Sequence, residues 1–109
     1  MAFDEALAGR IRKHLGKRGG LTEKKMFGGL AFLLKGNMCC GVSGQDLLVR
    51  LDPARTDQAL AEPHVRVFDL TGRPMKGWVL VGAQGLATDA ALARWIKLAV
   101  DYAGSLPAK

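Results

Sequence analysis

Two adjacent cysteines, Cys39 and Cys40, have the most obvious capacity for chemistry in this chain, because a thiolate is both a nucleophile and a metal ligand. In a regular strand their side chains point to opposite faces, so they cannot both bind one metal ion, and no C-x-x-C spacing occurs. Only His14 and His64 could assist them. We therefore expect no metal site and no cofactor, and we interpret the thiols as buried and inert. A cysteine–histidine pair that meets in space stays open as an alternative.

Two glycine-containing segments match catalytic motifs only in part. Gly28-Gly29 lies close to Lys24-Lys25, but the Lys-Ser/Thr pair that ends a phosphate-binding loop is missing. The segment Gly41-Val42-Ser43-Gly44 has its second glycine one residue too early for a nucleophile elbow, and no helix follows it. We interpret the first pair as a place of close packing or a bulge, and Ser43 as a turn residue. With no catalytic constellation, we predict that the protein is not an enzyme.

A basic stripe on the first predicted helix is the best candidate for a binding surface. It consists of Arg10, Lys13 and Lys17, which share one helical face. The chain has a net charge of +6 and a pI of about 9.8. Such a stripe can attract phosphate backbones or an acidic protein face, although a solvated surface is the simpler interpretation. Nucleic-acid binding usually adds aromatic platforms, and the large polar-tipped aromatics here are Tyr102, Trp78 and Trp95, of which Trp95 belongs to a predicted core face.

The hydrophobic periodicity predicts the elements that position these residues. Along the chain they are a helix over 3–16, three strands within 25–53, a short helix over 52–61, strands at 65–68 and 75–81, and a last helix of about sixteen residues after Thr88. The predicted turns are Gly36-Asn37, Ser43–Asp46 and Thr71–Pro74. On the last helix the apolar face consists of Leu92, Trp95, Ile96, Ala99 and Ala103.

This order, α-β-β-β-α-β-β-α, predicts one α+β domain over residues 1–109, with an antiparallel sheet of about five strands and helices packed on it. The first and fifth strands carry apolar side chains on both faces. The side of the sheet without helices is therefore either a surface for a dimer or another partner, or a side that the helices between them cover.

No segment has the pattern of a membrane span or a secretion signal. Apolar runs fall short of the eighteen or so residues that cross a bilayer. The start, MAFDEALAGR, is acidic where a signal peptide would be basic. We therefore expect a cytoplasmic protein whose cysteines are reduced, with no membrane partner.

Four segments of this chain resemble the N-terminal domain of the TfoX/Sxy family. They are KMFGGLAFLLKGNMCCGV, DLLVRLDP, RPMKGWVLV and LARWIKLAVDYAGSLPAK, and the resemblance runs from about Phe3 to Lys109. It implies a small bacterial α+β domain with a fold similar to that of type III secretion chaperones. The larger family members regulate competence and carry a second, helical domain that is not in this sequence, so we do not extend that role to this chain.

What the resemblance transfers is a set of structural positions, which we expect to hold the fold: Met26, Phe27, Gly28, Gly29, Met75 and Gly77. The functional expectation is a small non-catalytic regulatory or protein-interaction domain with an unidentified protein partner, a homodimer being one form of it. The alternative is a nucleic-acid-associated protein that binds phosphate backbone through Arg10, Lys13 and Lys17.

Overall fold

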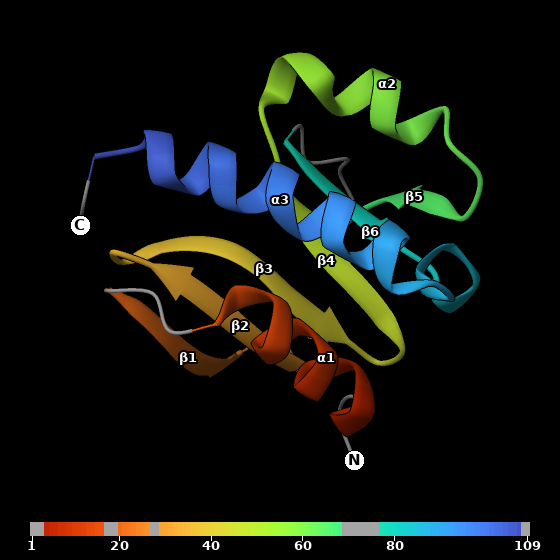
Figure 1. Ribbon diagram of the computed structural model, residues 1–109. Helices are drawn as coiled ribbons and strands as arrows, with labels where there is room; N and C mark the ends of the chain where they lie inside the picture. Colours follow the sequence, from red (N-terminus) through yellow and green to blue (C-terminus); the bar gives the residue numbers. More distant parts are fainter. Residues whose placement is uncertain (1–3, 17–19, 27–28, 69–76, 108–109) are drawn as a thin grey trace.

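The computed structural model describes residues 4–16, 20–26, 29–68 and 77–107 (Figure 1). Its elements are α1 (Glu5–Leu15), β1 (Leu21–Met26), β2 (Gly29–Leu34), β3 (Asn37–Ser43), β4 (Asp46–Arg50), the 3-10 helix η1 (Pro53–Arg55), α2 (Thr56–Leu60), β5 (Val65–Val67), β6 (Trp78–Val81), the 3-10 helix η2 (Ala83–Leu86) and α3 (Asp89–Ser105). The predicted α+β class and element order are confirmed, with one additional strand, β1. None of the described helices is long and apolar enough to cross a bilayer.

Some of the predicted features lie outside the described residues. They are Phe3 at the start of the first helix, Lys17 of the basic stripe, Phe27, Gly28, the turn Thr71–Pro74, and Met75 at the start of the predicted fifth strand.

The described strands form one antiparallel sheet in the order β1-β2-β3-β4-β6-β5. Helices α1 and α3 lie across one face of this sheet, and α2 lies beside β5 and β6 (Figure 1). Side chains from all three helices, including Ala59 of α2, belong to one buried cluster with the strand residues of that face. The helices therefore cover a single side of the sheet.

The helix faces and caps follow the sequence pattern closely. The five apolar residues predicted for the face of α3 are all buried. The Thr88 hydroxyl accepts a hydrogen bond from the Ala91 amide, and the Asp52 carboxylate accepts one from the Ala54 amide. At the start of α1, Asp4 accepts from the backbone amides of the first turn. Because side-chain caps satisfy amides that a helix leaves unpaired, these three residues fix where their helices begin.

Strand β1 was missed because it has no alternating apolar pattern. Leu21, Glu23 and Lys25 point toward the helix-covered side, opposite Leu34, Phe32 and Leu30 of β2. Glu23 is stable in that position because the Arg12 guanidinium of α1 binds its carboxylate. The strand is also at the sheet edge, where lysines discourage pairing with another chain.

The turn between β2 and β3 lies one residue earlier than predicted. Its central residues are Lys35 and Gly36, with φ of 53° and 83°, and two positive values are what a type I′ turn requires. Asn37 is instead the first residue of β3. Its side chain is buried, and its Nδ2 donates a hydrogen bond to the Pro107 carbonyl at 2.8 Å. Asn37 thus ties the chain after α3 to the sheet.

The assumption of a regular strand at the two cysteines is wrong. Phe32 pairs with Cys40 while Leu33 pairs with Met38, so Cys39 is an extra residue on β3. Such a bulge changes the alternation of side chains. Cys39 and Cys40 are both fully buried and belong to the same cluster beneath the helices.

Candidate interaction site at the ends of β4 and β6

The predicted basic stripe is not one continuous feature in the described part of the chain. Arg10 Nη2 donates to the Leu86 carbonyl at 2.8 Å and to Asp89 Oδ1 at 3.2 Å, so its side chain joins α1 to the start of α3. Lys13 is exposed on α1. Lys17 is outside the described residues. Of the two described members, Lys13 is the one left to act as a surface cation.

The thiols lie away from any surface at which they could react. Both cysteines are fully buried. The Cys40 thiol shares a hydrogen bond with the Cys39 thiol and is fully buried. Both effects raise the pKa of Cys40 well above its usual range. A raised pKa keeps the group as the thiol, which is the weaker nucleophile. Within the described residues, no three His, Cys, Asp or Glu side chains are grouped as metal ligands would be.

Gly77 fixes the backbone beneath the candidate site. It has a φ of 86°, its amide donates to the buried Thr56 Oγ1 at 2.8 Å, and its carbonyl accepts from the Leu51 amide. A Cβ at this position would be 3.2 Å from the Leu51 carbonyl oxygen and 3.3 Å from Pro53 Cγ. The glycine therefore allows the start of β6 to pack directly against the end of β4. Of the other signature positions, Met26 pairs with Gly29 where β1 meets β2.

The end of β4 presents an arginine beside two aromatic rings. Arg50 is the last residue of β4, lies between the buried Val49 and Leu51, and pairs directly with Trp78 of β6. The Arg50 Cζ lies 5.3 Å from the centre of the Trp78 ring and 5.6 Å from the centre of the Tyr102 ring of α3. All three side chains are partly exposed. These distances are those of cation–π contacts. We call these three residues the Arg50 cluster.

The charge of Arg50 is not neutralised within the described residues. Its Nη1 donates to the Met38 carbonyl at 3.5 Å, and no carboxylate forms an ion pair with it in the ranges that the structure describes. Four other described arginines do have carboxylate partners: Arg10 with Asp89, Arg12 with Glu23, Arg66 with Asp46, and Arg94 with Glu62. These contacts raise the pKa of Arg12 and of Arg94 and lower the pKa of Glu23. Most of the five N–H donors of Arg50 therefore have no partner among the described residues.

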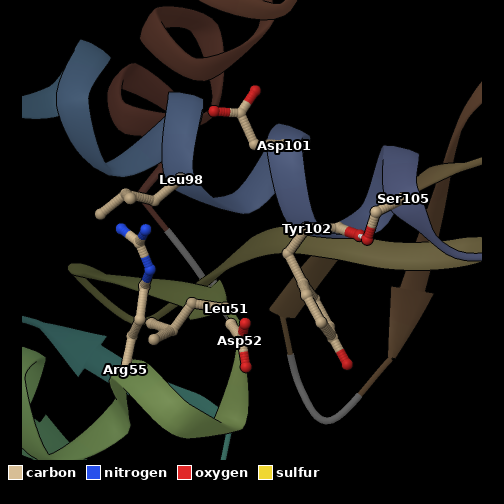
Figure 2. Close-up of a pocket in the computed structure, with 7 residues that line it drawn as sticks. All are labelled: Leu51, Asp52, Arg55, Leu98, Asp101, Tyr102 and Ser105. Carbon is tan, nitrogen blue, oxygen red and sulfur yellow. Dashed lines mark hydrogen bonds between the residues drawn. The ribbon is translucent and has the colours of Figure 1, made fainter.

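A cleft of about 210 Å³ is lined in part by Tyr102, which is also a member of the Arg50 cluster. Figure 2 shows Tyr102 among the residues that line this cleft. The cleft lies between α3 and the connection from β4 to η1, and its lining residues are Leu51, Asp52, Arg55, Leu98, Asp101, Tyr102 and Ser105. The Arg55 side chain extends toward Leu98 across this cleft (Figure 2). Like Arg50, Arg55 has no carboxylate in ion-pair contact among the described residues. The cleft thus offers apolar, hydroxyl and charged groups to a segment bound across it.

Only two residues of this site, Trp78 and Tyr102, stand out in the sequence, and only as polar-tipped aromatics. Arg50 falls within the predicted strands of 25–53 without any signal of its own. The signal that would have found the pair is the register of β4 with β6, since Arg50 and Trp78 are direct partners. The position of Tyr102 depends on how α3 lies on the sheet, which no local pattern encodes.

The model of the TfoX N-terminal domain matches residues 13–103. The chain belongs to the TfoX N-terminal domain family. No curated protein and no solved structure matches it. The TfoX N-terminal match spans all the described strands and contains every residue of the Arg50 cluster, so this site is part of the domain itself.

Proposed function

We propose that this TfoX N-terminal domain is a small non-catalytic, regulatory protein-interaction domain that binds its partner at the Arg50 cluster and the adjoining cleft. The observation that carries the proposal is the meeting of Arg50, Trp78 and Tyr102 on one partly exposed surface. Arginine, tryptophan and tyrosine are the residue types that most often dominate the binding energy of protein interfaces. Each comes from a different element, and Gly77 and the sheet register hold two of them rigidly in place.

A purely structural role would account for this geometry less well. Buried donors almost always have a hydrogen-bond partner, whereas the donors of a partly exposed guanidinium can turn to water or to a bound partner. Arg50 has one long hydrogen bond to a carbonyl and no ion pair among the described residues. The rings of Trp78 and Tyr102 hold the group in place without using its N–H donors. This arrangement supports a binding role, because the contacts that position Arg50 leave its donors open to a partner.

The test is affinity capture with three tagged forms: the wild type, Arg50→Gln and the matched control Lys13→Ala. Lys13 is an exposed cation on α1, so its loss removes the same charge from another part of the surface. We expect a protein that wild type and Lys13→Ala both retain and that Arg50→Gln loses. Sedimentation of the purified domain covers the case in which the partner is a second copy of this chain. Equal capture by all three forms would place the interface elsewhere, and no capture by any of them would contradict the proposal. We further propose a bacterial setting, as the family resemblance implies, and a cytoplasmic one, which the two reduced cysteines in the core fit.

Nucleic-acid binding through the basic helix is the second candidate, favoured by the exposed Lys13 and the net charge of +6. Arg10 is not a clean site to mutate because it also holds Leu86 and Asp89. The double change Lys13→Ala and Lys17→Ala is a better test. Binding to a labelled duplex that weakens steeply with added salt, and weakens again in the double variant, would support this candidate.

A further inference from the structure

We propose that Arg50 is an oxyanion-binding residue that accepts a carboxylate group from the partner, with the neighbouring cleft receiving apolar residues beside that carboxylate. The class of partner, a protein, rests on the proposed function; the binding of a carboxylate rests on the Arg50 cluster alone. The guanidinium carries a full positive charge, is partly buried, and has no carboxylate partner among the described residues. A carboxylate from a partner would supply the acceptor that the four ion-paired arginines find within the chain.

The two aromatic rings prepare Arg50 for this contact. Stacking restricts a long side chain that would otherwise lose rotamer freedom on binding, and so lowers the entropy that binding costs. The rings also shield the guanidinium from water, which strengthens a charge-assisted hydrogen bond. The donors that remain form a planar fork, and two coplanar carboxylate oxygens match it in a bidentate pair.

The surrounding charges favour a single carboxylate over a phosphate backbone. Tyr102, which touches Arg50, also lines the cleft that contains Asp52 and Asp101. Arg55 lines the same cleft and Lys97 is ion-paired with Asp101, so the charges there nearly balance and offer no excess of positive charge to the closely spaced phosphates of a nucleic acid. A peptide with one acidic residue between apolar residues needs only Arg50 for its charge and places its apolar side chains near Leu51 and Leu98.

The experiment uses two matched peptides, Ac-Leu-Glu-Leu-NH₂ and Ac-Leu-Gln-Leu-NH₂, which differ only in the charge of the central side chain. Each is titrated into ¹⁵N-labelled protein, and the signals followed are the Arg50 side-chain N–H groups and the Trp78 indole N–H. We expect the Glu peptide to shift both and the Gln peptide to bind about tenfold more weakly, the equivalent of one charge-assisted hydrogen bond. Inorganic phosphate and a short single-stranded oligonucleotide are titrated in parallel.

Variants show whether the guanidinium is responsible. Arg50→Gln should weaken the Glu peptide about tenfold, and Arg50→Lys, which keeps the charge but loses the planar fork, should give an intermediate loss. Lys13→Ala should leave binding unchanged. If the spectrum of Arg50→Gln lacks the dispersion of a folded protein, the Glu peptide is titrated into Arg50→Lys and Trp78→Phe instead.

Three results would overturn the proposal. The first is an equal shift with both peptides, and the second is equal binding of the Glu peptide by wild type, Arg50→Lys and Trp78→Phe. The third is a stronger response at Arg50 to phosphate or to the oligonucleotide than to the Glu peptide. The two proposals also fail separately. A captured protein together with equal shifts from the Glu and Gln peptides would end the carboxylate assignment and leave the interaction domain standing. Selective binding of the Glu peptide with no captured partner would do the reverse.

Discussion

The centre of the sheet and the ends of β4 and β6 use the same strands, yet their side chains have different surroundings. Beneath the helices, Phe32, Val49 and Val79 are fully buried in one apolar cluster. One residue away along β4 and β6, Arg50 and Trp78 are partly exposed, and Arg50 lacks a carboxylate partner in the described part of the chain. The centre makes its contacts within the molecule, whereas Arg50 at the strand end has donors that no described residue accepts.

This difference separates two roles that composition alone does not distinguish. The apolar centre contributes stability, because removing its side chains from water is the main favourable term in folding. Arg50 and Trp78 are only partly buried and contribute less of that kind, and we propose that their residue types serve binding. Variants at the two places should therefore differ in what they damage.

The largest effect is expected from Phe32→Ala at the centre. The ring is fully buried opposite Cys40, so its removal leaves a cavity beneath the helices. We expect the free energy of unfolding to fall by about 3–5 kcal/mol. Chemical denaturation followed by circular dichroism measures it. A loss below about 1 kcal/mol would mean that the centre is loosely packed, and the contrast with the strand ends would disappear.

The next largest effect is expected at Gly77, which joins the two regions. Alanine there must adopt a φ of 86° and place its Cβ 3.2 Å from the Leu51 carbonyl oxygen. We expect Gly77→Ala to lower the free energy of unfolding by about 1–3 kcal/mol. The matched control is Gly9→Ala on the exposed side of α1, where a Cβ meets no atom within 4 Å. That change should raise stability by about 0.5–1 kcal/mol, and equal effects of the two variants would contradict the role assigned to Gly77.

Much of the centre was predictable because its signals are local and repeated. The face of α3 and the caps Asp52 and Thr88 follow from spacing and residue type, and the structure confirms them. The turn Gly44-Gln45 lies within the predicted segment, and Gly44 has the positive φ that such a turn favours. At these positions the local preference of each residue agrees with the global fold, so the sequence pattern alone predicts the structure.

The edges and the candidate site were less predictable because they depend on tertiary contacts. Strand β1 is stabilised in part by Arg12, which neutralises Glu23 on the side that faces the helices. The turn at Lys35 places a lysine at positive φ, for which its residue type gives no hint. The meeting of Arg50, Trp78 and Tyr102 requires both the β4–β6 register and the placement of α3.

A small effect on stability is expected from Arg50→Gln, in contrast to its effect on binding. The variant loses two cation–π contacts at a partly exposed position, worth together about 1 kcal/mol. Denaturation of the variant beside Phe32→Ala measures the contrast directly. A loss above about 2 kcal/mol would show that Arg50 mainly holds β4 to its neighbours, and the separation of roles would fail at this residue.

The smallest effect is expected from Glu23→Gln, which opens the ion pair with Arg12. Two hydrogen bonds of 2.9 Å join the side chains, but both are more than a third exposed, so the loss at neutral pH should be about 0.2–1 kcal/mol. Arg12 lowers the pKa of Glu23 below its ordinary value in the folded protein. The stabilisation is therefore present above the unfolded-state pKa and is lost as the pH falls through the lower folded-state pKa.

The two variants can be compared by measuring free energies of unfolding as the pH is lowered from neutral into the acid range. The difference between wild type and Glu23→Gln should shrink with acid, because the carboxylate that distinguishes them becomes protonated. The difference between wild type and Arg50→Gln should stay constant, since no carboxylate pairs with Arg50 in the described residues. If that difference also shrinks, a carboxylate of the protein itself neutralises Arg50 in solution, and its donors are not free for a partner.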